Sequence, residues 1–171
     1  TKTYNGALGI SIDGKPVPNM IELAKLAGMR TGNVSTSEIQ DATPAAMGSH
    51  ALGRKCYGPE NTKEANKGCF GDFYNSQYRE NGGLGSISEQ LVETRADVTL
   101  GGGAKAFNQI VQEGGAGRNP YLSGKEGIKQ TTWSKGSSVL DNAKDNGFQV
   151  VTTAEELKAI KKADQDAPLL G

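Results

Sequence analysis

Two oxygen-bearing side chains stand one residue apart at the start of an expected helix. Asp41 and Thr43 lie in the string STSEIQDATPAA, and hard cations such as Mg²⁺ take carboxylate and hydroxyl oxygens as ligands. The same residue types are common helix N-caps, because a side-chain oxygen there accepts a free backbone N–H. On these residues alone capping is the commoner use, and the pair indicates a cation site only if other features support it.

Arg54, His50 and a glycine-rich stretch are the other candidates. The guanidinium of Arg54 matches two phosphate oxygens, but an arginine at a helix end more often faces solvent or the helix dipole. LGGGA at 100–104 could receive a phosphate between a strand and a helix. It lacks GxGxxG and GK[ST] spacing, which favours a simple turn. His50 is the single histidine, so this chain cannot form a zinc site with several imidazoles, and we expect a structural role for it.

Cys56 and Cys69 are the two cysteines of the chain, and they lie in a stretch rich in glycine, asparagine and proline. They lack the CxxC spacing and nearby histidines that a structural zinc site would need. This favours a local disulfide over two unrelated free thiols. Such a bridge would contribute roughly 3 kcal/mol on the chain-entropy model, and disulfides persist in oxidising compartments such as the periplasm.

These candidates must be positioned by alternating helices and strands. Capping boxes at Asn19 with Glu22 and at Ser86 with Glu89 mark two helix starts, and Thr153 precedes a third. The predicted elements are helices over 19–28, 41–52, 86–96, 137–146 and 154–163, a helix containing Ala106 and Val111, and strands over 29–36, 97–100 and at Val150 and Val151.

This alternation predicts an α/β fold with a layered, mostly parallel sheet and helices on both faces. Only about three strands are evident, which is few for such a sheet. We therefore expect residues 1–171 to form part of a domain, with a disulfide-pinned loop excursion at 55–85.

Composition excludes some partners. Lys and Arg number 19 against 19 Asp and Glu, so the positive field of a nucleic-acid or anionic-membrane binder is missing. No run approaches the ~20 apolar residues of a membrane span. We expect neither nucleic acid nor a membrane as partner. Because Thr1 is not a methionine, we also expect a processed or excised part of a longer protein.

Six strings in a fixed order carry a specific likeness. They are KTYNGALG at 2–9, TGNVST at 31–36, QDATPAA at 40–46, RKCYGP at 54–59, EQL at 89–91 and RADVTLGGGAK at 95–105. Together they resemble bacterial periplasmic alkaline phosphatases. The likeness covers nearly the whole chain, loosens at 61–81 and 112–145, and returns at the terminal PLLG.

The resemblance implies a phosphomonoester hydrolase. In that family a serine attacks phosphorus and forms a phosphoseryl intermediate, beside two zinc ions and one magnesium ion. The matching strings imply that Arg54 grips the phosphate and stabilises its charge in the transition state. They also imply that Thr43 is a magnesium ligand, that Asp41 orders magnesium-bound water, and that Cys56 and Cys69 form a disulfide. The complete enzyme is expected to be a homodimer, periplasmic or secreted.

The chain also departs from the family pattern. The nucleophile motif would lie before Thr1, the remaining metal ligands would lie after Gly171, and His50 matches none of them. The zinc ligands are therefore absent from this chain, and we expect the isolated piece to be inactive. The alternative is a non-catalytic fragment that binds phosphate or a partner and self-associates through exposed apolar edges.

Overall fold

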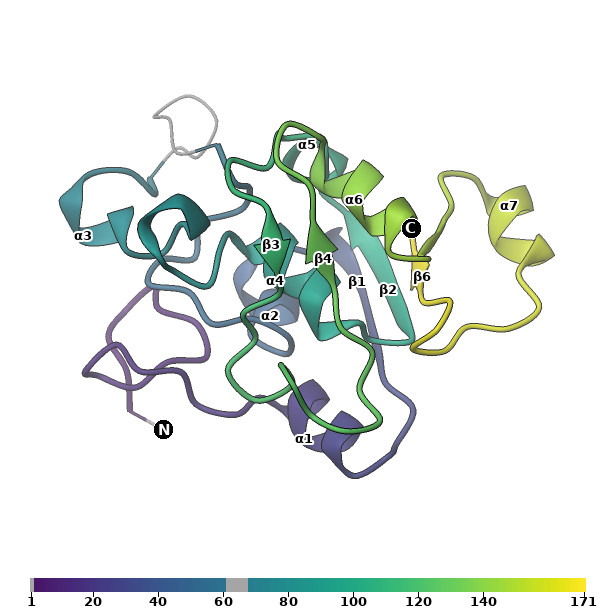
Figure 1. Cartoon of the computed structure of the whole chain (residues 1–171), viewed down its shortest axis with the longest axis horizontal. Coiled ribbons are helices and arrows are strands. Elements are labelled where there is room, and N and C mark those ends of the chain that lie inside the picture. The colour runs from purple at the N-terminus through teal and green to yellow at the C-terminus, as the bar shows by residue number, and fades with distance from the viewer. Residues whose placement is uncertain (1, 61–67) are drawn as a thin grey trace.

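A parallel sheet lies at the centre of the fold (Figure 1). The structure, a computed structural model, describes residues 2–60 and 68–171. The strand order is β1-β2-β6-β5, with β1 at Gly32–Glu38, β2 at Val98–Gly102, β5 at Gln149–Val150 and β6 at Leu169–Leu170. Every pairing in this sheet is parallel, which confirms the predicted α/β class. A separate antiparallel pair joins β3 (Gly115–Ala116) to β4 (Thr132–Trp133).

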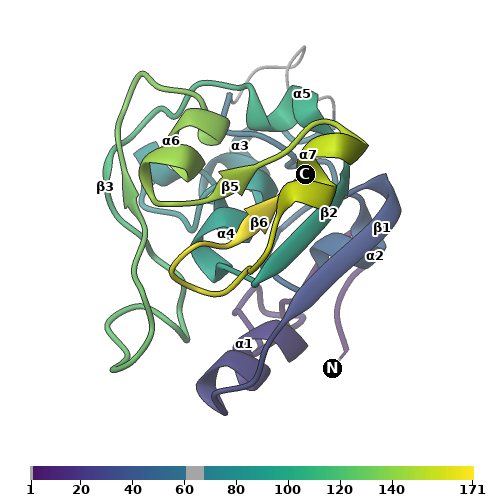
Figure 2. The same ribbon diagram turned by 90° about the vertical axis from the view of Figure 1, so that its right-hand side faces the viewer.

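Helices lie on both sides of the sheet. Figure 2 shows α4 (Ile87–Thr94) behind it, α6 (Val139–Asp145) beside β5, and α7 (Ala154–Ala159) in front. The residues of α7 are all exposed, so only the side that carries α4 and α6 is closely packed. The other helical segments are α1 (Met20–Leu26), α2 (Ala42–Ala45), α3 (Asp72–Asn75), α5 (Ala104–Phe107) and the 3₁₀ turn η1 (Arg79–Asn81).

The hydrophobic core fills the space between the sheet and the helices on its packed side. Helix α4 contributes Ile87, Leu91 and Val92, and α6 contributes Val139 and Ala143. Each fully buried side chain of this size stabilises the fold by roughly 1.5–3 kcal/mol. The opposite face of the edge strand β1 exposes Val34, whose relative accessibility is 69%.

Capping boxes start three of the helices, as predicted. In α1 the Asn19 side chain accepts from the backbone N–H of Glu22, and the Glu22 carboxylate accepts from the N–H of Asn19. Helix α4 has the same reciprocal pair in Ser86 and Glu89, and α7 has it in Thr153. Each box satisfies backbone donors that a helix start leaves unpaired.

The helix predicted over 41–52 is wrong beyond Ala45, where α2 ends. Tertiary partners take the backbone groups that a longer helix would need. The N–H of Ala51 donates to Leu8 at 2.8 Å, and that of His50 donates to the Gln90 side chain at 2.8 Å. A Cβ at Gly48 would lie 3.2 Å from a methyl group of Leu91, so the chain passes close to α4 here.

The helix expected to include Ala106 and Val111 also stops early, at Phe107. Ile110 forms an isolated bridge with Ser138, and the N–H of Val111 donates to Ser137 at 2.9 Å. Helical spacing of the apolar residues here reflects burial of Phe107 and Val111 against the core. It does not reflect a continuous helix.

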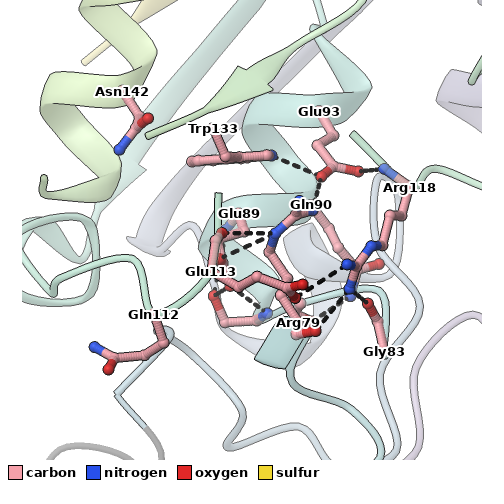
Figure 3. A network of polar contacts seen from close by, with 12 residues as sticks. Arg79, Gly83, Glu89, Gln90, Glu93, Gln112, Glu113, Arg118, Trp133 and Asn142 are labelled. Carbon is pink, nitrogen blue, oxygen red and sulfur yellow. Dashed lines mark hydrogen bonds and ion pairs between the residues drawn. The ribbon is translucent and has the colours of Figure 1, made fainter. Parts of the chain in front are cut away.

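A buried ionic network joins the loop after α3 to α4 and β4 (Figure 3). One oxygen of Glu93 accepts from Arg79 Nη1 and from Trp133 Nε1, both at 2.7 Å, and the other accepts from the N–H of Arg118 at 2.8 Å. Arg79 Nη2 donates to the carbonyl of Ala116 at 3.0 Å. Breaking one partner of such a buried pair is strongly destabilising, because a charge is left uncompensated.

The predicted excursion at 55–85 contains α3, η1 and Arg79 of this network. Its stretch at 61–67 lies outside the described residues. In the parts of the chain that the structure describes, no helix has the length and apolar character needed to cross a membrane.

Glu89 makes the stability of the fold depend on pH. Burial raises the pKa of its carboxyl to about 7, against hydrogen bonds from Ser86 and the charge of Arg79. A carboxyl whose pKa is higher in the folded protein than in the unfolded chain stabilises the fold in full at a pH below its unfolded pKa. This stabilisation is lost as the pH rises through the folded pKa of about 7. We expect Glu89→Gln to remove this loss, so that wild type weakens relative to the variant by up to roughly 3 kcal/mol between pH 5 and 8.

Urea unfolding of both proteins at pH 5, 6, 7 and 8 measures this difference. Glu93, whose pKa is also raised by burial, is present in both proteins. Parallel pH profiles for wild type and Glu89→Gln would contradict the expectation.

Candidate functional site

The side chains of Arg54 and Tyr57 both donate hydrogen bonds to one carboxylate oxygen of Asp41. Asp41 follows the carboxyl end of β1 and directly precedes α2, and its Oδ1 accepts from Arg54 Nη2 at 2.8 Å. The same Oδ1 accepts from the hydroxyl of Tyr57 at 3.1 Å. The structure thus joins Asp41 and Arg54, which the sequence named as separate candidates, and adds Tyr57.

The electrostatics of this cluster favour one protonation state of each group. The hydrogen bond from Arg54 is the main cause that lowers the pKa of Asp41, helped by the Tyr57 hydroxyl. Burial, followed by the hydrogen bond to Asp41, raises the pKa of Tyr57 to about 12. At neutral and alkaline pH Asp41 is therefore a carboxylate, and Tyr57 stays protonated and able to donate.

Arg54 combines a fixed charge with access to solvent. Its side chain is 47% exposed and that of Asp41 is 38% exposed. Its backbone N–H donates to the carbonyl of Gly6 at 2.6 Å, which ties the segment to the N-terminal stretch. Only Nη2 bonds Asp41, so the other N–H groups of the guanidinium remain able to bind oxygens of an anion.

Asp41 stands at the N-cap position of α2, but its side chain makes no capping hydrogen bond. The capping interpretation is therefore wrong for the Asp41 side chain, because Arg54 and Tyr57 hold the carboxylate instead. Thr43 lies in the single turn of α2 and is exposed. These two residues remain the oxygen donors that a hard cation would use here.

The donor set fits magnesium better than zinc. A carboxylate and a hydroxyl suit Mg²⁺, which keeps several waters and takes few protein ligands. Among residues 2–60 and 68–171, no three or more His, Cys, Asp or Glu side chains gather into a metal-binding group. Both cysteines are in a disulfide, and His50 is fully engaged as described below. The described residues therefore do not fit a zinc site.

The predicted disulfide between Cys56 and Cys69 is confirmed, with the Cα atoms 5.0 Å apart. Both cysteines are completely buried in a small cluster with Tyr78, and Tyr74 packs against it. Gly53 allows this packing, since a Cβ there would lie 2.6 Å from the ring of Tyr74. The bridge fixes the segment that follows Arg54.

His50 has the structural role expected of it. The residue is 1% exposed, its Nε2 lies 2.8 Å from Glu22 Oε1, and its Nδ1 lies 2.7 Å from the carbonyl of Gly9. Because that carbonyl can only accept, Nδ1 carries a proton and donates. Glu22 also accepts from Asn119 at 2.8 Å. This buried cluster ties α1 to two loops.

The LGGGA stretch forms the end of β2 and the turn into α5. Gly103 has a φ of 103°, and a Cβ there would lie 1.9 Å from the Gln40 side chain. The glycine is thus required by backbone conformation and by close packing. This supports the turn interpretation over a phosphate cradle.

Tyr57 is the site residue that sequence reasoning missed. It lies inside RKCYGP, one of the strings that carried the resemblance. No local pattern in the sequence shows that its hydroxyl reaches Asp41, 16 positions earlier.

Comparison with protein families gives one result for the whole chain. The family model described as Alkaline phosphatase matches residues 1–171. The alkaline phosphatase of Escherichia coli (strain K12) is 45% identical over 170 residues, which is 99% of this chain and 31% of that protein. The streptomycin-6-phosphate phosphatase of Streptomyces griseus is 36% identical, covering 99% of this chain and 31% of its own length. The chain therefore spans about a third of the length of these curated relatives.

Solved structures agree. The alkaline phosphatase of Thermus thermophilus superposes with a TM-score of 0.58 at 27% identity, over 99% of this chain and 25% of that one. The alkaline phosphatase of the Antarctic bacterium TAB5 gives a TM-score of 0.57 at 25% identity, over 99% of this chain and 35% of that one. The shared architecture extends over nearly all of the chain.

Removal of the disulfide should destabilise the fold. The bridge closes a loop with a sequence separation of 13, and we expect Cys56→Ala with Cys69→Ala to lower the free energy of unfolding by about 3 kcal/mol. Urea unfolding under oxidising conditions measures the change. The same transition in reduced wild type is the control, and an unchanged midpoint in the double variant would contradict the expectation.

Proposed function

The chain belongs to the alkaline phosphatase family, and we propose that it supplies the phosphate-binding arginine and a magnesium ligand to a metal-dependent phosphomonoesterase. The proposal rests chiefly on Arg54, whose guanidinium is held by Asp41 and is nevertheless 47% exposed. An arginine that is fixed but accessible can bind an anion with little loss of side-chain freedom.

Arg54 would grip two oxygens of the phosphoryl group. A guanidinium presents parallel N–H donors that match such oxygens. It also keeps its positive charge at alkaline pH, the range to which the name of the family refers. The interaction favours the transition state where negative charge spreads over the phosphoryl oxygens. The carboxylate of Asp41 accepts from Nη2 of Arg54 and thereby orients the guanidinium.

Thr43 and Asp41 would serve the magnesium ion. On this proposal Thr43 Oγ1 binds the metal directly, and Asp41 orders a metal-bound water through its carboxylate. When bound, such metals supply charge stabilisation and help to activate an attacking oxygen. The described residues of this chain offer no zinc ligand set, so the zinc ions and the seryl nucleophile are assigned to the remainder of a fold of which this chain spans about a third.

The disulfide also indicates the compartment in which the enzyme works. We assign it to the periplasm or to secretion, because the Cys56–Cys69 bridge needs an oxidising compartment. Residues 1–171 would form part of a larger phosphatase domain, and the complete enzyme would be a homodimer that acts on phosphomonoesters.

The alternative is a non-catalytic piece that binds phosphate or a partner and self-associates. The position of β1 at the sheet edge and the 69% exposure of Val34 on it favour this alternative, since the unpaired backbone groups of an edge strand are open to pairing. On both accounts the chain by itself would not hydrolyse p-nitrophenyl phosphate. Only the phosphatase proposal expects the complete enzyme to need Arg54.

Loss of the guanidinium should therefore impair the complete enzyme. We expect Arg54→Ala to lower kcat/KM for p-nitrophenyl phosphate by about 10²–10³-fold, the usual effect of removing a donor to a developing oxyanion. Arg30→Ala is the matched control, because Arg30 also pairs with an aspartate but on Asp97, and its activity should stay at the wild-type level. Equal activity of the two variants would refute the assignment of Arg54.

Loss of the Thr43 hydroxyl should weaken the response to magnesium. We expect Thr43→Ala to need about tenfold more Mg²⁺ for half-maximal activity and to recover at saturating Mg²⁺. Thr43→Ser keeps the hydroxyl and is expected to behave as wild type. If both variants shift alike, Thr43 Oγ1 is not a metal ligand.

A further inference from the structure

The hydroxyl of Tyr57 makes a hydrogen bond to which the proposed function assigns no role. It donates to Asp41 Oδ1, the atom that also accepts from Arg54. Its ring is packed against the hydrophobic core, and the Lys55 ammonium lies 5.3 Å from the centre of the ring. One side chain thus spans from the core to the proposed anion site.

The backbone around Tyr57 is held by the first turn of α4. The N–H of Ser88 donates to the carbonyl of Tyr57 at 2.9 Å, and the N–H of Ile87 donates to that of Cys56 at 2.8 Å. Ile87 and Ser88 are buried, and Cys56 is bridged to Cys69. These contacts use helix-start donors that would otherwise be unpaired, and they fix Tyr57 relative to the core.

Arg54 and Asp41 are held less firmly. Their side chains are 47% and 38% exposed, and an arginine loses much rotamer freedom when it is fixed in one position. An exposed ion pair contributes little by itself. A second donor from a rigid residue removes rotations of the carboxylate and thereby limits the positions of the guanidinium.

We propose that Tyr57 is a positioning residue, whose hydroxyl holds Asp41 in the orientation that presents the Arg54 guanidinium to the phosphoryl group. The inference rests on the proposed function of Arg54 and adds a residue to that site. Tyr57 would not touch the substrate, and its effect would pass entirely through Asp41. Its raised pKa of about 12 keeps the hydroxyl a donor over the alkaline range.

Tyr57→Phe tests the proposal in the complete enzyme, because it removes one oxygen and keeps the packed ring. We expect kcat/KM for p-nitrophenyl phosphate to fall about tenfold, as for loss of a hydrogen bond to a charged group. The inhibition constant of inorganic phosphate should rise by a similar factor. The melting temperature should change little. A purely structural role would lower the melting temperature and leave phosphate affinity in the folded enzyme unchanged.

A double-mutant cycle with Asp41→Ala locates the effect. Because the hydroxyl acts through the carboxylate, Tyr57→Phe should cause no further loss in the Asp41→Ala background. Tyr121→Phe is the matched control, since its hydroxyl donates to the backbone carbonyl of Pro16. That variant should retain wild-type kcat/KM and phosphate affinity.

Three results would overturn the inference. They are an unchanged Tyr57→Phe enzyme, losses from Tyr57→Phe and Asp41→Ala that multiply, and an equal loss in Tyr121→Phe. If the complete wild-type enzyme has no phosphatase activity, the proposed function and this inference fail together. An active enzyme that needs Arg54 but ignores Tyr57 would refute only the inference.

Discussion

Helix α4 is buried along its whole length, and Gln90, Glu93 and Thr94 on it bond groups from distant parts of the chain. Gln90 donates to the carbonyls of His50 and Gly85, at 2.8 Å in each case, and the hydroxyl of Thr94 donates to the carbonyl of Gly48 at 2.8 Å. Glu93 accepts from Arg79, Trp133 and Arg118. An unpaired polar group here would lose its hydration without compensation. These hydrogen bonds hold the loops at His50, Gly85 and Gly48 against α4.

The same helix reaches the proposed site through its first turn. Its early N–H groups hold the backbone of Cys56 and Tyr57, and the disulfide holds Cys56 from the other side. Asp41 comes from a different direction, at the carboxyl end of β1. In open parallel sheets that end is where ligands bind. The proposed site therefore lies between the first turn of α4 and the carboxyl end of β1.

The described residues carry one cluster that suits a phosphatase site. The described residues bring together a guanidinium, a carboxylate, a hydroxyl and a nearby threonine, which suit an anion and a hard cation. They offer no multi-ligand metal group. The chain spans about a third of the length of the curated relatives it matches. On the other face of the edge strand β1, Val34 is 69% exposed.

Features that depend on near neighbours in the chain could be predicted from the amino-acid sequence. Helix starts at Asn19, Ser86 and Thr153 were predictable because each capping box closes within three residues. The disulfide, the parallel α/β class and the family were also evident. Only the tertiary structure decided where α2 ends, because Leu8 and Gln90 take the backbone groups that would extend it. It alone also brought Tyr57 and Arg54 to one oxygen of Asp41, since hydrogen bonds between separated segments leave no periodic pattern in the sequence.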